Sequence, residues 1–103
     1  MKNIISREAM ILEALTHGEN YGMGLIELIT QITNKEIKIL TGALQRKLWE
    51  LTEQKLVKHT RSEKGLITPT RNREYFELTE AGKIQADANR KIMAALFRLK
   101  VPK

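Results

Sequence analysis

Apolar residues recur at helical spacing in four stretches of this sequence, and only two short segments, between the third and fourth stretches, have the character of β-strands. The third stretch has the clearest pattern. Leu44, Leu48 and Leu51 stand at positions i, i+4 and i+7, which predicts a helix with one buried stripe. Thr41 is expected to cap this helix, which should run to about Gln54. The residues that this register turns away from the core are Gly42, Arg46, Trp49 and Glu50.

Two shorter helices are predicted before it. Ser6 is expected to cap the first, and Gly18 is expected to end it. Asn20 is expected to cap a second helix over Tyr21–Thr33, with Asn34 ending it in a left-handed conformation. The inward stripes consist of Ile11, Leu12 and Leu15 in the first helix and of Leu25, Leu28, Ile29 and Ile32 in the second.

After the third helix the sequence predicts a β-hairpin and a long final helix. The strands are expected at Leu56–Arg61 and Glu74–Leu78, separated by a long basic tip that contains a glycine and a proline. Thr79 is expected to cap the last helix, Glu80–Leu99. The fold class is thus mainly α with a small hairpin, an α+β fold.

The last helix has more apolar surface than one small core can cover. We therefore expect it to pair with the same helix of a second copy, because a two-fold partner buries one self-complementary patch on each chain. The residues predicted to line this dimer interface are Ile84, Ala88, Ile92, Met93, Leu96, Phe97 and Leu99. This divides the chain, within one structural unit, into residues 1–78 for binding and 79–103 for dimerisation.

Charge points to a polyanionic partner. The 103 residues suffice for one domain, and 18 Lys and Arg outnumber 12 Asp and Glu. Between Lys55 and Arg73 six basic residues stand against one acidic residue. Charge alone fits nucleic acid or an anionic membrane surface. No uncharged stretch exceeds seven residues and no signal peptide is evident, so we expect a cytoplasmic protein without a membrane span.

Several chemistries lack the residues that they need. The absence of cysteine excludes disulfides and thiolate catalysis, and the two histidines do not have the spacing of a helical metal site. The glycines of GENYGMG match neither a P-loop nor a dinucleotide-binding motif. Carboxylates are scattered among basic residues, without a clustered nucleophile and base. The sequence predicts no catalytic site, no metal and no cofactor.

Three helices, a basic hairpin and a long helix follow one another in the order of a winged helix-turn-helix. A helix fits the major groove of DNA, and a basic hairpin beside it can lie along phosphates or enter the minor groove. The leading hypothesis is therefore a protein that binds double-stranded DNA. The alternatives are an adaptor that keeps this fold but uses its long helix to bind another protein and, ranked last, a small enzyme.

Three motifs resemble those of the PadR family. GALQRKLWELTEQKLV at residues 42–57 is similar to the family's G-T-L-Y-P-x-L-x-R-L-E-x-x-G-L-I. RNREYFELTEAG at 71–82 resembles R-x-R-x-Y-Y-x-L-T-x-x-G, and GENYGMGLIELI at 18–29 resembles G-x-x-Y-G-Y-x-I. The resemblance covers residues 8–99. It implies a homodimeric transcriptional regulator, usually a repressor, of the compact branch with a single C-terminal helix; any small-molecule effector is left open.

The departures from the family pattern lie on the proposed DNA-reading side. Gln45 and Arg46 replace Tyr-Pro, Lys55 stands where a turn glycine is usual, and Asn72 stands where the wing often carries proline. The base preference of the family therefore does not carry over.

The candidate DNA contacts come from the recognition helix, the wing and the start of the second helix. They are Thr41, Gly42, Gln45, Arg46 and Trp49; Lys58, Arg61, Lys64, Arg71 and Arg73; and Tyr21. Arg46 either contacts DNA or is merely solvated, and Gln45 either reads adenine or faces solvent. Trp49 and Tyr21 also have structural interpretations, Trp49 by packing against the wing or a partner subunit. Phe76 is expected to anchor the wing to the core.

Overall fold

The computed structural model describes residues 6–64 and 72–100, apart from the side chains of residues 97–100. In chain order the elements are α1 (Arg7–Leu15), β1 (Asn20–Tyr21), α2 (Gly22–Ile32), α3 (Thr41–Glu53), β2 (Val57–Lys64), β3 (Asn72–Leu78) and α4 (Glu80–Lys100). The three strands form an antiparallel sheet in the order β1–β3–β2. A mainly α winged helix-turn-helix with a long last helix is confirmed.

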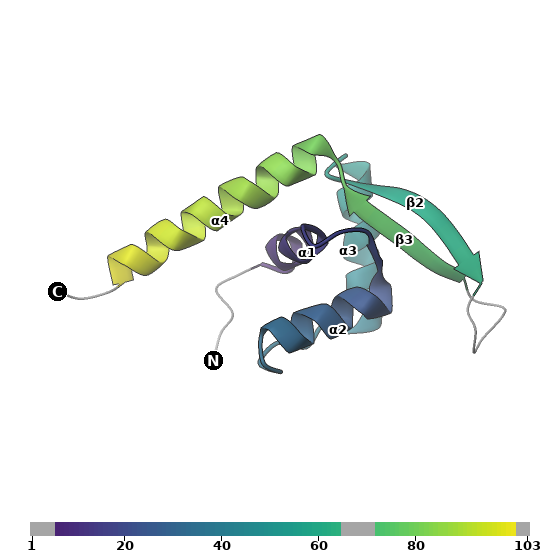
Figure 1. The fold of residues 1–103 in the computed structure, drawn as a ribbon, viewed down its shortest axis with the longest axis horizontal. Helices are drawn as coiled ribbons and strands as arrows, with labels where there is room; N and C mark the ends of the chain where they lie inside the picture. Colours follow the sequence, from purple (N-terminus) through teal and green to yellow (C-terminus); the bar gives the residue numbers. More distant parts are fainter. Residues whose placement is uncertain (1–5, 65–71, 101–103) are drawn as a thin grey trace.

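The hairpin and α4 extend in opposite directions from the place where β3 ends (Figure 1). Helices α1, α2 and α3 lie together on one side of this angled arm. The wing, defined as strands β2 and β3, therefore projects at one end of the molecule, beside α3. The end of α4 lies far from it.

The core forms where the inward stripes of the three short helices meet the wing. Its members include Ile11, Leu12, Leu15, Leu25, Ile29, Leu44, Leu48, Leu51, Val57, Phe76, Leu78 and Ala86. The stripes predicted for α1 and α3 are confirmed, as is Phe76 as the wing's anchor. In α2 the prediction is wrong at Ile32, which is 58% exposed because it lies at the end of the helix.

Two of the predicted helix caps are confirmed. The hydroxyl of Ser6 accepts the Ala9 N–H at 3.1 Å, and the hydroxyl of Thr79 accepts the Gly82 N–H at 3.0 Å. Asn34 takes the predicted left-handed conformation, with φ 54°.

Three predicted boundaries are wrong. Asn20 does not cap α2: its side chain accepts the Tyr21 N–H at 2.8 Å, and these two residues pair with β3 as a short strand. Thr41 is the first helical residue of α3, and the cap position belongs to Leu40, whose side chain makes no capping bond. Helix α1 ends at Leu15, and Gly18 follows in a positive-φ turn.

The wing strands are longer than predicted, and β2 contains a bulge. His59 pairs with Phe76 and Arg61 pairs with Tyr75, so Thr60 is the extra residue. The bulge reverses the alternation of side chains beyond it, because a shift of one residue moves a side chain to the other side of the sheet. Arg61 consequently lies on the same side as Tyr75, away from Phe76.

Candidate nucleic-acid interface

Helix α3 presents a polar surface beside the wing. Its leucine stripe is buried, while Thr41, Gly42 and Arg46 on the remaining surface are exposed. Space around Gly42 is open, since a side chain there would meet no atom within 4 Å. These three predicted contact residues therefore lie on one accessible helix surface, as the sequence register indicated.

Gln45 lies at the boundary between this surface and the core. Its side-chain amide occupies the place where a β-carbon on Gly22 would stand. Gly22 opens α2, so a larger residue at this position would collide with the amide. Gln45 thus packs against the neighbouring helix and is half-buried, rather than fully facing solvent.

Trp49 joins α3 to the wing. Its ring meets Phe76 edge-on with centroids 5.0 Å apart, and lies 5.4 Å from the ring of His59. Beyond it, Glu74 accepts bonds from Ser62 at 2.5 Å and interacts with His59 Nε2 at 2.6 Å. The Ser62 hydroxyl, helped by His59, lowers the pKa of the Glu74 carboxyl. One side of the Trp49 ring is therefore packed against the wing, as the packing interpretation expects, while 43% of the residue's surface stays exposed.

The opposite side of the sheet carries a row of stacked side chains across all three strands. The guanidinium of Arg61 on β2 lies 3.9 Å from the ring centre of Tyr75 on β3. Tyr75 packs against Tyr21 on β1 at 5.2 Å, and Arg73 lies 4.8 Å from the Tyr21 ring centre. Tyr21 and Arg73 are thus part of a structural stack, in agreement with the structural interpretation of Tyr21.

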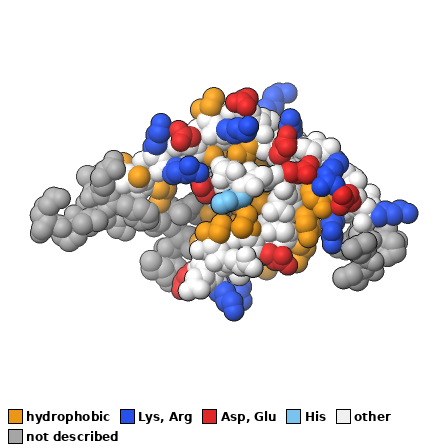
Figure 2. Space-filling view, viewed as in Figure 1, with side chains coloured by type: hydrophobic (Ala, Val, Ile, Leu, Met, Phe, Trp, Pro, Cys, Tyr) orange, Lys and Arg blue, Asp and Glu red, His pale blue; other side chains and the backbone are white. Residues whose placement is uncertain are grey.

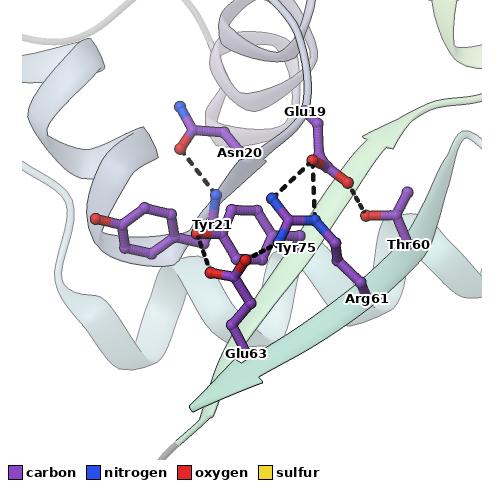
Figure 3. A network of polar contacts seen from close by, with 7 residues as sticks. All are labelled: Glu19, Asn20, Tyr21, Thr60, Arg61, Glu63 and Tyr75. Atoms are coloured by element: carbon purple, nitrogen blue, oxygen red, sulfur yellow. Dashed lines mark hydrogen bonds and ion pairs between the residues drawn. The ribbon is translucent and has the colours of Figure 1, made fainter. Parts of the chain in front are cut away.

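Carboxylates hold Arg61 from two directions (Figure 3). Nε and Nη2 donate to Glu19 Oε1 at 3.3 and 3.2 Å, and Nη1 pairs with Glu63. Glu63 also accepts the Tyr75 hydroxyl at 3.0 Å, and Glu19 accepts the Thr60 hydroxyl. The hydroxyl of Thr60 and then Arg61 lower the pKa of the Glu19 carboxyl, so it stays ionised at neutral pH.

The other basic residues of the wing differ in their partners. Lys58 pairs with Glu77 across the strands at 3.1 Å, whereas Lys64 is exposed at the end of the described part of β2. Arg71 lies outside the described residues. Figure 2 shows acidic side chains interleaved with basic ones on the face in view. The sequence analysis missed Glu19 and Glu77; the Lys58–Glu77 pair follows from the hairpin register, but nothing local to Glu19 signals its role.

Helix α4 leaves much of its apolar surface uncovered. Ile84, Ile92 and Leu96 are 70%, 57% and 44% exposed. Ala88 is half-buried, and Met93 instead lines a groove of about 260 Å³ against α1 and α2. The side chains of Phe97 and Leu99 lie outside the described residues. The helix is held to α1 through buried Ala86 and by the Arg90–Glu13 ion pair at 2.6 Å.

A family profile shows to which protein family the chain belongs. The profile of the transcriptional regulator PadR-like family matches residues 11–88. The chain belongs to the PadR-like family. These are DNA-binding transcriptional regulators without enzymatic activity, so the prediction of a non-catalytic regulator is confirmed. In the described parts of this PadR-like chain no helix is long and apolar enough to cross a membrane, and no cluster of three potential metal ligands occurs.

Solved structures agree with the PadR-like fold. Bacillus subtilis PadR in complex with operator DNA gives a TM-score of 0.69 at 16% identity, covering 84% of this chain and 46% of that one. A transcriptional regulator from Clostridium thermocellum gives 0.70 at 20% identity, covering 93% of both. The circadian clock associated protein Pex from Anabaena gives 0.65 at 17% identity, covering 90% of this chain and 78% of that one.

The PadR-like chain spans about half the length of Bacillus subtilis PadR. At 16–20% identity the comparison supports the shared fold and does not equate the chain with Pex. Among curated proteins the sequence has no match.

Proposed function

We propose that this PadR-like chain binds an operator in duplex DNA as a homodimer and represses transcription from it. The observation that carries the proposal is the accessible polar surface of α3, from Thr41 and Gly42 to Arg46, on a helix whose leucine stripe is fully buried. A helix of this kind fits the major groove, where arginine reads guanine through O6 and N7. The relative from Bacillus subtilis was crystallised with operator DNA.

In this proposal the residues of α3 have different roles. Arg46 contacts a base edge, and Thr41 and Gly42 lie where the helix comes closest to the DNA backbone. Gln45, packed against Gly22, reads an adenine only with the part of its amide that is left accessible. Trp49 acts indirectly, because its ring is engaged with Phe76 and His59.

The wing supplies phosphate contacts that hold the helix in register. Lys58, Lys64 and Arg73 are the described candidates, and Arg71 extends the set by its place in the sequence. Tyr21 supports Arg73 through its ring. Such contacts add affinity that does not depend on base sequence, and they make binding sensitive to salt because each releases counterions.

The last helix sets the spacing of two recognition helices. Residues 79–103 form the dimerisation segment and 1–78 the DNA-binding part. The uncovered side chains of Ile84, Ile92 and Leu96 are the described support, with Ala88, Met93, Phe97 and Leu99 completing the predicted interface. A two-fold dimer should place the two α3 helices roughly 34 Å apart, one turn of DNA.

Footprinting tests the proposal. The DNA upstream of the protein's own gene is digested with and without the protein, at fixed salt and with random DNA as competitor. We expect protection of a short inverted repeat. If the upstream DNA is protected uniformly or not at all, the footprint is repeated on sequences that the protein selects from a random pool of DNA. Uniform or absent protection there as well would contradict operator binding. A reporter fused to the protected region should be expressed less when the protein is present; higher expression would make the protein an activator.

A further inference from the structure

Arg61 was predicted to contact DNA, but its guanidinium is already engaged on several sides. Two of its nitrogens donate to Glu19 and a third pairs with Glu63. One face of the group lies 3.9 Å from the ring centre of Tyr75. Arginine presents a fixed planar fork of donors that suits carboxylates, and here Nε and Nη2 share one oxygen of Glu19. Three of its five N–H donors are thus engaged while the side chain is 44% exposed, so a phosphate would have to compete with these two carboxylates for the guanidinium.

The bulge at Thr60 brings this arrangement about. It turns Arg61 to the side of the sheet where Tyr75 and Tyr21 stack. Thr60 itself donates its hydroxyl to the same carboxylate, that of Glu19. Glu19 therefore binds two consecutive residues of β2, the bulged residue and the one that the bulge re-aims.

Glu19 belongs to a distant part of the chain. It lies in the turn between α1 and β1, and 42 positions separate it from Arg61. In the sheet order β1–β3–β2, strand β2 shares no backbone hydrogen bonds with β1. The Glu19 side chain thus reaches across β3 and ties the outer wing strand to the turn that leads into α2 (Figure 3).

We propose that Arg61 is a positioning residue and that its pairing with Glu19, the wing clamp, fixes the angle at which the wing meets DNA. Trp49 of α3 holds the other side of the wing through His59 and Phe76. The wing is therefore contacted on both sides, by the recognition helix on one and by the α1–β1 turn on the other. Without the clamp the wing is still held by its buried core residues and by Trp49, but β2 loses its tie to the α1–β1 turn at the bulge. The phosphate-binding residues are then held less firmly in register with α3.

Substitution of Glu19 tests whether Arg61 acts through the clamp or contacts DNA directly, because the two roles predict opposite changes in the affinity for DNA. Glu19→Ala removes a negative charge, which on electrostatic grounds alone strengthens binding to DNA. The clamp predicts the reverse, a fall in affinity of up to about fivefold, the upper end of the range for exposed ion pairs. Glu27→Ala is the matched control, since it removes the same charge from an exposed position on α2. Tighter binding of both variants would overturn the clamp.

The salt dependence of affinity gives a second measure. Arg61→Gln should weaken binding without changing the slope of log K against log salt, because no phosphate contact is lost. Lys64→Gln, with the same loss of charge on the same strand, should flatten that slope by about 0.9. Arg61→Lys should fail to restore affinity, because lysine keeps the charge but lacks the planar fork. A flattened slope in Arg61→Gln, restored by lysine, would make Arg61 a phosphate contact.

The clamp rests on the proposed function, so one measurement is made without DNA. Amide hydrogen exchange of β2 in the free protein should be faster in Arg61→Gln and Glu19→Ala, and the double variant should be no faster than either single variant. Unchanged exchange would overturn the clamp even if DNA binds. If the variants exchange faster but the unsubstituted protein binds no DNA, the clamp is supported as a structural contact and the proposed function is contradicted.

Discussion

Helices α3 and α4 are both amphipathic, yet only α3 has its stripe of aliphatic side chains covered. In α3, Leu44, Leu48 and Leu51 are at most 1% exposed, because α1, α2 and β2 pack over them. In α4, Ile84 and Ile92 are more than half exposed. Within one chain, the stripe of α3 is therefore covered and that of α4 is not.

The difference indicates what kind of partner each helix is suited to. Once its stripe is buried, α3 offers hydroxyl, amide and guanidinium groups, which suit the edges and phosphates of DNA. The accessible surface of α4 is aliphatic at intervals of one to two turns, which suits a hydrophobic partner and is costly to leave in water. In the proposed dimer the two surfaces act together, because the apolar contact between α4 helices would place two copies of the polar surface of α3.

Truncation of the covered stripe should have the largest effect. Leu48→Ala removes a fully buried side chain between α1, α2 and the wing, and should lower the free energy of unfolding by about 2–5 kcal/mol. Chemical denaturation measures it. Ile84→Ala is the comparison: its effect should shrink as the protein is diluted, whereas that of Leu48→Ala should persist. An Ile84→Ala effect as large as that of Leu48→Ala at every concentration would remove the contrast between the helices.

Breaking the α4 interface should come next in size. Leu96→Glu places a charge in a surface that the dimer would desolvate, and should weaken dimerisation roughly a hundredfold or more. Sedimentation at micromolar concentration measures it, and DNA affinity should fall as well because two recognition helices are no longer linked. Lys91→Gln, which alters an exposed position of the same helix, is the control. A Leu96→Glu variant that stays dimeric would contradict the interface.

The polar side of α3 should give a smaller and more selective effect. Arg46→Ala should cost about 1–3 kcal/mol at the operator if the side chain reads a guanine, and much less on random DNA. Lys64→Ala is the matched control, since loss of a phosphate contact weakens both DNAs alike. Equal weakening by Arg46→Ala on operator and random DNA would reduce Arg46 to a backbone contact.

The sequence predicted those parts of the fold whose signals are local. The period of Leu44, Leu48 and Leu51 and the caps at Ser6 and Thr79 depend on residues within one or two turns, and the structure confirms them. Alternation along β3 likewise predicted that Phe76 is buried opposite Tyr75.

The parts that failed depend on distant partners. Asn20 has the chemistry of a cap, but β3 draws it into a strand only two residues long. The bulge at Thr60 has no signature in the sequence of β2. The sequence therefore did not distinguish Arg61 from the other basic residues of the wing, because Glu19 is brought to it only by the fold. The exposure of Thr41, Gly42 and Arg46 was predicted correctly because one helical register fixes it, and their contact with DNA stays a prediction.

Lys55 links the two helices and departs from the family pattern. It ends α3 with φ 66°, a left-handed conformation that disfavours any residue with a β-carbon. The start of α4 depends on it, because the Lys55 carbonyl accepts the Thr79 hydroxyl at 2.7 Å and the next carbonyl, of Leu56, accepts the Thr79 N–H at 3.1 Å. The usual turn glycine is therefore explained by backbone conformation, and lysine here is strained.

Lys55→Gly should accordingly stabilise the fold by about 1 kcal/mol, the smallest effect expected, because the strain is relieved in the folded state while glycine adds some freedom to the unfolded chain. Thermal unfolding measures it. Gly82→Ala at the facing end of the junction should have the opposite sign, since a β-carbon on Gly82 would collide with the Leu56 carbonyl oxygen, a backbone atom that cannot rotate away. If Lys55→Gly is destabilising, the lysine side chain contributes more than its backbone strain costs, and the junction between α3 and α4 is held by that side chain as well as by Thr79.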